Sequence, residues 1–569
     1  MPTPEPARDL GHVLTPEIES QLLERHHAYL NRETKPPLIR LWDKNFKLIS
    51  RIALPETWDA EELAHNAGEA TIEIVGEANA WLREIIVYDT KPEEDLFITF
   101  DFDPDKPHDW RNRWGGFVDT ITDTEEQGKA TRTVLKCLHG RRYLETTLLA
   151  SNPVFPQEIQ LPKMFLWGGP TATACASALW INLFRLYTLN GFFPLPRNLF
   201  APETYLENVS PLNWPVQVMP LNPITDQSRW CTLGAKWKDA HTIFDPLLKN
   251  AGVVAKVYCW LPGDPPPYTM FGPLADVLKP SRACFIVDFQ NKSGVTGPTG
   301  TALDGGLNLI AATADDMITE FLFPIDADGD GETDPFIRRL LGVAPQPPPI
   351  VYRDAGYGGP LKSTMTIHKS QATDIVTGGK SPQWVNQAIT FAIRYALSQL
   401  AQTIAFYGQA QGTEGLDNLY QGQLDDVFLA YMRWVDPRRS ATVGPYARRE
   451  FFEPGTGSAY TINGVQSLRQ GDYKCQAYTT FKFDVLDGFP YKLGEDFELG
   501  DRIQAERRGI LHTDQVLAIR RSGGRLTSHR PLISLGDDSR EEDPISRGFA
   551  QIANVANFAA LLAGSGDMF

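Results

Sequence analysis

The chain of 569 residues lacks the local motifs of the common enzyme classes. It contains no G-x-S-x-G nucleophile elbow and no H-E-x-x-H zinc motif. Neither of its glycine-rich segments, at Gly168–Gly169 and Gly294–Gly300, is followed by Gly-Lys-Ser/Thr. Paired carboxylates such as Glu93-Glu94 are adjacent in sequence, and adjacent side chains point apart on a helix or strand. We therefore expect no enzymatic activity and assign no catalytic residue.

Signals for a disulfide framework, secretion or membrane insertion are also missing. The six cysteines are isolated in sequence and form no C-x-x-C pair, so buried free thiols are expected. The first residues are polar and acidic, which does not fit a signal peptide. The most apolar run, Ala174 to Leu186, is interrupted by Asn182 and Arg185 and is too short to span a bilayer. We expect a chain that is folded in a cytoplasm and has no transmembrane segment.

Acidic residues outnumber basic ones, 70 to 54, so the formal net charge is −16. Binding to nucleic-acid phosphates needs clustered Lys and Arg, so sequence-specific nucleic-acid binding is not expected. An acidic surface would instead suit a wall past which DNA slides without sticking. Hydrophobic residues make up 42% of the chain, which is ordinary for a soluble globular protein with a substantial core.

Two β-rich segments lie far apart in the sequence, with helical patterns between them. The first runs from about Pro37 to Leu149 and the second from about Tyr478 to Arg521. Both are typical of small barrels, so the predicted fold class is α+β with two split β-barrel-like domains, inserted helical domains and a C-terminal amphipathic helix. The predicted domains are an N-terminal helical arm (1–36), a first β-barrel (37–150), a mixed insertion (151–345), the start of a second β domain (346–380), a helical bundle (381–475), the rest of the second barrel (476–525), and a linker with a C-terminal helix (526–569).

Single elements can be predicted within these domains. Phe97 to Phe102 largely alternates between apolar and polar residues, so one face of that strand is expected to be buried and the other exposed to water. Other strands are expected at Glu84–Tyr88, Gly252–Leu261 and Ala283–Phe289. Helices are expected at Ala176–Leu189, Trp384–Ile404, Leu424–Val435, Thr442–Phe452, Ile462–Tyr473 and Pro544–Leu562.

The sharpest local motif is an acidic loop. Asp326, Asp328 and Asp330 alternate and are followed by Gly331, as in the first half of a calcium-binding loop. Asp334 could supply a later ligand, directly or through water. The match is incomplete, because Ile337 stands where an EF-hand has a bidentate Glu. Two interpretations stay open: a Ca²⁺ site with these four aspartates as ligands, or a solvated acidic turn.

Several motifs, in their order along the chain, resemble minor tail proteins of long-tailed phages that infect actinobacteria. The resemblance covers nearly the whole chain, and each motif is structural, so their order carries it. They are Ile39–Asn45, Arg113–Gly116, Lys136–Arg142, Val376–Gly379, Ala459–Thr461, Leu468–Arg469, Phe497–Arg502, Asp514–Val516 and Asp543–Leu562.

The resemblance implies a hub protein at the tail tip or baseplate of a siphovirus. Such hubs place two β-barrel domains per subunit in a homotrimer that continues the tail tube and surrounds the DNA exit channel. The implied partners are the distal tail protein, the tape-measure protein and other minor tail proteins, and the implied location is the virion. This chain departs from some hubs in having no recognisable lysozyme-like or peptidase-like domain, which counts against cell-wall cleavage.

Two alternative functions stay open. The 13 Trp and 18 Tyr would suit a tail component that binds host-surface carbohydrate, although aromatic residues are more often core or interface anchors. A cell-wall hydrolase could use carboxylates that are distant in sequence.

The calcium interpretation predicts a metal-dependent stability. Removing Ca²⁺ with a chelator should lower the temperature of thermal unfolding, because a cation that binds only the folded state stabilises it. Asp328→Asn should abolish the difference between the chelated and the Ca²⁺-supplied protein. A metal content and unfolding temperature that the chelator leaves unchanged would remove the proposed site.

Overall fold

The computed structural model describes most of the chain in two compact units. The described residues are 20–21, 23–25, 27, 35–53, 55–76, 79–153, 165–188, 210–315, 335–353, 362–378, 430–454, 462–475, 477–488, 490–507, 509–525 and 530–535. The first unit comprises the described residues up to Thr364 and those from Phe481 onward. The second comprises those from Met365 to Thr480. Among the described residues, no helix has the length and apolar character that crossing a membrane requires.

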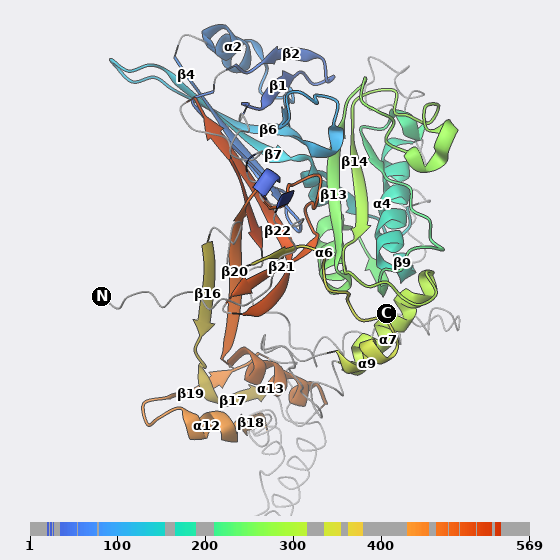
Figure 1. The fold of residues 1–569 in the computed structure, drawn as a ribbon, viewed down its shortest axis with the longest axis vertical. Coiled ribbons are helices and arrows are strands. Elements are labelled where there is room, and N and C mark those ends of the chain that lie inside the picture. The colour runs from blue at the N-terminus through green and yellow to red at the C-terminus, as the bar shows by residue number, and fades with distance from the viewer. Residues whose placement is uncertain are drawn as a thin grey trace, which may run out of the picture. The chain divides into compact units, whose positions relative to one another are not determined.

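One large antiparallel sheet organises the first unit (Figure 1). Its strands follow the order β20–β23–β22–β3–β4–β7–β6–β5–β1–β2. The pairing of β22 with β3, from Ala518↔Leu63 to Gly524↔Thr57, joins the two β segments that the sequence separates. The strands are β1 (Leu38–Trp42), β2 (Leu48–Arg51), β3 (Thr57–Leu63), β4 (Glu69–Val75), β5 (Phe97–Asp101), β6 (Arg113–Thr124), β7 (Arg132–His139), β20 (Tyr478–Leu486), β22 (Ile510–Gly524) and β23 (Arg530–Leu535). A short parallel pair, β15 (Val351–Tyr352) with β21 (Arg502–Arg507), is attached through β22.

Each β segment has its own hydrophobic core. The core of the first segment contains Ile39, Ile72, Phe100 and Leu135, together with other residues between positions 39 and 137. The core of the second contains mainly residues of β15 and of the strands from β20 onward. The two segments therefore pack separately although their strands hydrogen-bond in one sheet.

Two predictions for the first segment are wrong. Glu84–Tyr88 is helical, not a strand: α2 (Ala80–Glu84) continues into a π-helical turn, η2 (Ile85–Asp89). Leu82 and Ile86, four residues apart, bury one face of this helix, which outweighs the β-branched composition. Strand β5 is buried on both faces, not on one. Its polar residues are satisfied inside the protein, since Thr99 accepts a hydrogen bond from the Trp42 indole.

A layer of shorter strands and helices, inserted between the two β segments, lies beside the large sheet. Its hairpin of β13 (Val253–Trp260) and β14 (Cys284–Asn291) confirms both predicted strands. In Figure 1 this hairpin lies between the sheet and α4 (Thr171–Tyr187), which confirms the helix predicted at Ala176–Leu189. The layer also contains β8 (Leu148–Leu149), β9 (Phe165–Pro170), β10 (Val216–Val218), β11 (Trp230–Ala235), β12 (Lys238–Asp239), α3 (Tyr143–Thr146), α6 (Ala240–Ala251), α7 (Ala302–Ala314) and α9 (Phe336–Leu340).

Local interactions fix both ends of helix α6, and the β13–β14 hairpin begins directly after its C-terminal end. The Asp239 side chain accepts a hydrogen bond from the Thr242 backbone N–H and caps the helix N-terminus. Gly252 ends the helix in a left-handed conformation, with φ 64°, and β13 begins at the next residue. The position of the hairpin is thus fixed by a helix end that favours glycine.

The second unit is small. Strand β17 (Ala372–Gly378) pairs antiparallel with β18 (Tyr431–Val435) and parallel with β19 (Arg448–Phe452). Its described residues also include helices α12 (Pro437–Thr442) and α13 (Ile462–Cys475), and α13 confirms the helix predicted at Ile462–Tyr473. The buried Arg439 donates to the Ala372 carbonyl and to the Asp472 carboxylate.

Two helix predictions in this unit are wrong. Residues 431–435 and 448–452, predicted within helices at Leu424–Val435 and Thr442–Phe452, form strands β18 and β19. Both pair with the central strand β17, and this tertiary pairing overrides the weak helical pattern of the short segments. The helix predicted at Trp384–Ile404 and the C-terminal helix at Pro544–Leu562 lie outside the described residues.

Candidate functional site

The β13–β14 hairpin contacts both β segments of the first unit. All eight residues of β13 are buried. On one side the hairpin contacts β6 and the turn after β7, and on the other Val254 belongs to the core of the second β segment. A hairpin inserted between the segments in sequence therefore contacts both of them in space.

Three glycines allow the close contacts of the hairpin. A Cβ atom on Gly115 of β6 would lie 2.2 Å from the Cys259 Cβ, and one on Gly140 would lie 2.4 Å from the Phe285 ring. Gly500, with φ 88°, leaves space for Val254. Because Cβ atoms do not approach so closely, larger residues here would displace the hairpin from the segments.

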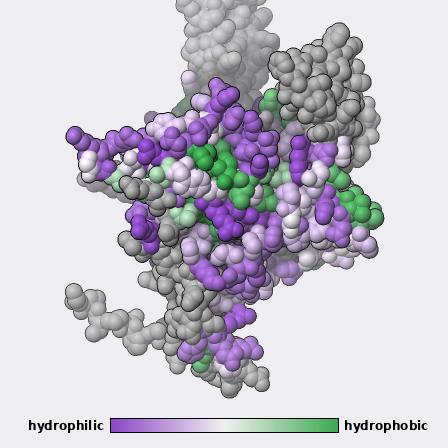
Figure 2. Space-filling model, turned by 90° about the horizontal axis from the view of Figure 1, so that it is seen from above, coloured by the Kyte–Doolittle hydropathy of each residue, from purple (hydrophilic) through white to green (hydrophobic). Residues whose placement is uncertain are grey.

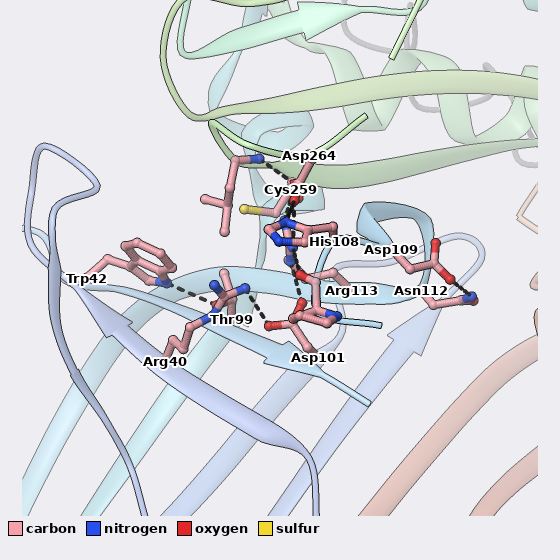
Figure 3. A network of polar contacts seen from close by, with 12 residues as sticks. Arg40, Trp42, Thr99, Asp101, His108, Asp109, Asn112, Arg113, Cys259 and Asp264 are labelled. Atoms are coloured by element: carbon pink, nitrogen blue, oxygen red, sulfur yellow. Dashed lines mark hydrogen bonds and ion pairs between the residues drawn. The ribbon is translucent and has the colours of Figure 1, made fainter. Parts of the chain in front are cut away.

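The first polar contact of the hairpin is a buried network around Arg113, the first residue of β6 (Figure 3). Arg113 Nε donates to Asp101 Oδ1 at 2.7 Å, and its Nη1 donates to Asp264 Oδ2 at 2.5 Å. The guanidinium also donates to the backbone carbonyls of Cys259 and Pro107, at 3.1 and 2.7 Å. The Arg113 side chain is fully buried, so its charge depends on these partners.

The two carboxylates are held on separate elements. Asp101 ends β5 and also accepts from Arg40 Nη2 at 2.6 Å. Asp264 follows β13 and accepts from the Leu261 backbone N–H at 2.8 Å. Burial alone would lower the pKa of Arg113, but Asp264 and Asp101 outweigh it and raise the pKa above its ordinary value. The network therefore joins the large sheet to the end of β13 with Arg113 charged.

A second buried arginine lies at the turn after β7. Arg141 Nη1 donates to the Ala255 carbonyl of β13 at 2.7 Å. Burial lowers the pKa of Arg141 to about 10, still above neutral pH. Burial and the nearby Arg141 charge lower the pKa of His139 to about 3, so His139 is neutral at pH 7. The motif Lys136–Arg142 thus supplies a second polar contact between the first β segment and the hairpin.

The third contact joins the hairpin to the second β segment. Lys256, in the middle of β13, lies 2.7 Å from Glu498 Oε2. Lys292, just after β14, lies 2.7 Å from both Glu498 Oε1 and Asp501 Oδ1. Burial would raise the pKa of Glu498, but Lys256 and Lys292 outweigh this effect and hold the pKa below its ordinary value. Glu498 is therefore ionised at neutral pH.

The four predicted metal ligands, Asp326, Asp328, Asp330 and Asp334, lie outside the described residues. Within the part of the chain that the structure describes, no group of three or more His, Cys, Asp or Glu side chains could hold a metal ion. The six cysteines are free and buried, as predicted.

The residues of the polar contacts were not predicted from the sequence as one site. Arg113, Arg141, Glu498 and Asp501 do belong to motifs that carry the family resemblance. The sequence could have singled out Lys256, because it is the lone charged residue in the apolar strand Val-Val-Ala-Lys-Val-Tyr-Cys-Trp. No signal linked any of them to its partner.

Comparisons with known proteins agree with the resemblance. The family described as Siphovirus ReqiPepy6 Gp37-like protein matches residues 38–523. The chain belongs to this family. The chain is also 21% identical to the minor tail protein Gp28 of Mycobacterium phage D29, over 80% of this chain and 81% of the relative. Gp28 of Mycobacterium phage L5 matches equally well. By this membership the chain is a structural minor tail protein of the siphophage virion and not an enzyme.

Solved structures of other tail proteins are more distant from this chain. A tail protein from Neisseria meningitidis MC58 is 9% identical, with a TM-score of 0.34 over 90% of this chain and 99% of the other. A 43 kDa tail protein of prophage MuSo2 from Shewanella oneidensis is 8% identical, also with a TM-score of 0.34, over 88% of this chain and 100% of the other.

The network around Arg113 generates a stability prediction. Arg113→Met leaves the buried Asp264 without its arginine and Asp101 with Arg40 alone, and should lower the free energy of unfolding by about 3–5 kcal/mol. Arg132→Met removes an exposed pair with Glu73 on the same sheet and should cost less than about 1 kcal/mol. Urea unfolding of the purified variants measures both. Equal losses of unfolding free energy in the two variants would contradict the conclusion that Arg113 forms buried ion pairs that stabilise the fold.

The third contact generates a pH prediction. Since the pKa of Glu498 is lowered in the folded state, its contribution to stability is complete above the ordinary pKa of a glutamate and fades as the pH falls through the lower folded-state pKa. Glu498→Gln should therefore lower the urea midpoint at pH 7, and the gap to the wild type should close in acid. Glu495→Gln, in an exposed pair with Lys492, should leave the midpoint nearly unchanged at both pH values. A Glu498→Gln gap that stays constant with pH would contradict this account.

Proposed function

We propose that this minor tail protein forms a trimeric hub at the tail tip or baseplate, where it continues the tail tube and surrounds the DNA exit channel. The observation that supports this most is the joining of two separately cored β segments, far apart in the chain, through the pairing of β22 with β3. A subunit with two such modules can contribute two tube-continuing positions, so three subunits would match a six-fold tube.

The proposal also assigns roles to the two β segments, to the neighbouring tail proteins and to the acidic loop. The two β segments, 37–150 and 476–525, would be the barrel-like modules that meet the tube. The distal tail protein, the tape-measure protein and other minor tail proteins would be the neighbours of the ring. The aspartates of the acidic loop, Asp326 to Asp334, would bind Ca²⁺ as a structural cation.

The surface charge fits passage of DNA without retention. The formal net charge is −16, and the face seen in Figure 2 is mostly hydrophilic with separate apolar patches. A repulsive or neutral wall lets a polyanion move along it, whereas clustered Lys and Arg would bind its phosphates. The apolar patches are candidates for contacts between subunits or with neighbouring tail proteins.

The proposal predicts a defined assembly. Light scattering of the purified protein should give three times the chain mass of 63.5 kDa, and averaged images of the tail end should show a three-fold ring that contains this chain. The mass should hold across a dilution series, because a ring that carries a tail must be stable. A monomer at all concentrations, together with tail images that lack the ring, would contradict the hub.

A further inference from the structure

The outer side of α4 carries two exposed aromatic side chains, one helical turn apart. Trp180 is 42% accessible and Phe184 is 45% accessible, and their rings stack with centroids 5.8 Å apart. Both rings also contact the buried Trp214 ring, with centroids 6.0 and 6.3 Å away, which holds them in place. The opposite side of α4 packs toward the β13–β14 hairpin (Figure 1), so the two rings point away from the core.

A basic turn lies next to this side of α4. Lys236 and Trp237 connect β11 to β12, which begins at Lys238, and both lysines are exposed. The Arg185 guanidinium of α4 lies 5.2 Å from the centroid of the Trp237 ring. Arg185 also donates to the Leu148 carbonyl of β8 at 3.1 Å, and the Leu148 side chain is 44% accessible. The turn is therefore attached to the edge of the aromatic side of α4.

The conformation of this turn is fixed. Trp237 has a φ of 51°, in the left-handed region that a bulky residue rarely adopts. Such a conformation persists only where the surrounding structure holds it. The Trp237 N–H donates to the Leu149 carbonyl at 2.8 Å, Lys238 pairs with Leu149 across β12 and β8, and Arg185 covers the ring. The two lysines are therefore held beside the apolar side chains of α4 and β8.

Cations outnumber carboxylates in this region. Among the residues that the structure describes, no carboxylate forms an ion pair with Arg185, Lys236 or Lys238. The adjacent carboxylates are engaged, because Asp239 caps α6 and Glu145 pairs with Arg142. Four basic side chains against two acidic ones give a local net charge of +2, in a chain of −16: Arg142, Arg185, Lys236 and Lys238 against Asp239 and Glu145. Charge complementarity therefore favours an anionic partner.

We propose that this surface binds an anionic phospholipid membrane at its interface, without crossing it. The α4–β12 surface comprises Leu148, Trp180, Phe184, Arg185, Lys236 and Lys238. Aromatic side chains favour the headgroup level of a bilayer, and a helix with apolar side chains on its outer side and cations beside them is typical of interfacial binding. The long Lys and Arg side chains can reach lipid phosphates while the rings lie deeper. The proposal is independent of the hub.

The combination of charge and apolar area favours a bilayer over a free polyanion. A DNA duplex would engage Lys236 and Lys238 but leave the Phe184 and Leu148 side chains in water. A bilayer uses both parts of the surface, because cations attract its headgroups and apolar side chains enter the acyl boundary. The two kinds of partner are thus distinguished by whether Phe184 contributes to binding.

Sedimentation of the full-length protein with large lipid vesicles tests the proposal. The protein should bind phosphatidylglycerol vesicles about tenfold or more tightly than phosphatidylcholine vesicles, because only the former carry net negative charge. Lys236→Gln with Lys238→Gln should weaken binding to phosphatidylglycerol about 25-fold, about fivefold for each cation removed. Phe184→Ser should weaken binding to the same vesicles about tenfold, because a buried ring no longer contributes.

Two controls match these variants in kind. Lys91→Gln with Lys129→Gln changes the net charge equally at exposed positions and should leave vesicle binding nearly unchanged. Ile224→Ser removes an apolar side chain that is 68% accessible elsewhere and should also leave it unchanged. An unchanged urea midpoint shows that each variant is folded, and the exposed lysine pair carries the test if Phe184→Ser does not fold.

Several results would overturn the proposal. Wild-type protein that does not bind phosphatidylglycerol vesicles would exclude a lipid partner. Equal losses in the lysine variant and its control would show a general effect of charge. Binding to a DNA duplex that depends on Lys236 and Lys238, with vesicle binding unaffected by Phe184→Ser, would assign the surface to a polyanion. A loss of oligomer mass in the lysine variant, with vesicle binding unchanged, would assign it to a second copy of the chain.

Discussion

The structure of the first unit depends on a fully buried cation that is shared between two carboxylates on different elements. Arg113 begins β6, Asp101 ends β5, and Asp264 follows β13. Removing one member would leave an uncompensated charge in the interior, which costs far more than an exposed ion pair. The interaction therefore fixes where the inserted layer meets the large sheet, and the glycines at 115 and 140 let the surfaces approach.

The inserted β13–β14 hairpin extends this constraint to the other end of the chain. Lys256 and Lys292 carry its contact to Glu498 and Asp501, and Val254 enters the second hydrophobic core. Together with the pairing of β22 and β3, these contacts make two β segments and one insertion interdependent. Such interdependence suits the proposed hub, because a subunit of a tube would have to keep its shape while neighbours bind it.

The sequence predicted those elements whose pattern is local. The apolar run at Gly252–Leu261 specifies a buried strand, and the period of Ile462–Tyr473 specifies a helix. The prediction from sequence was wrong for β18 and β19, because pairing with β17 overrides the local helix preference of these segments. The partners of Arg113 were not predictable, because Asp264 lies 151 residues away and a single sequence carries no record of that proximity.

The central claim is that the hairpin and both β segments form one cooperative structure. Native-state hydrogen exchange of the intact protein tests this most directly, through the opening free energies of β3, β13 and β22 amides. The account predicts that the slowest amides of all three strands exchange with the same opening free energy and the same denaturant dependence. A hairpin that opens at much lower free energy than β3 and β22, as an independent unit, would contradict it.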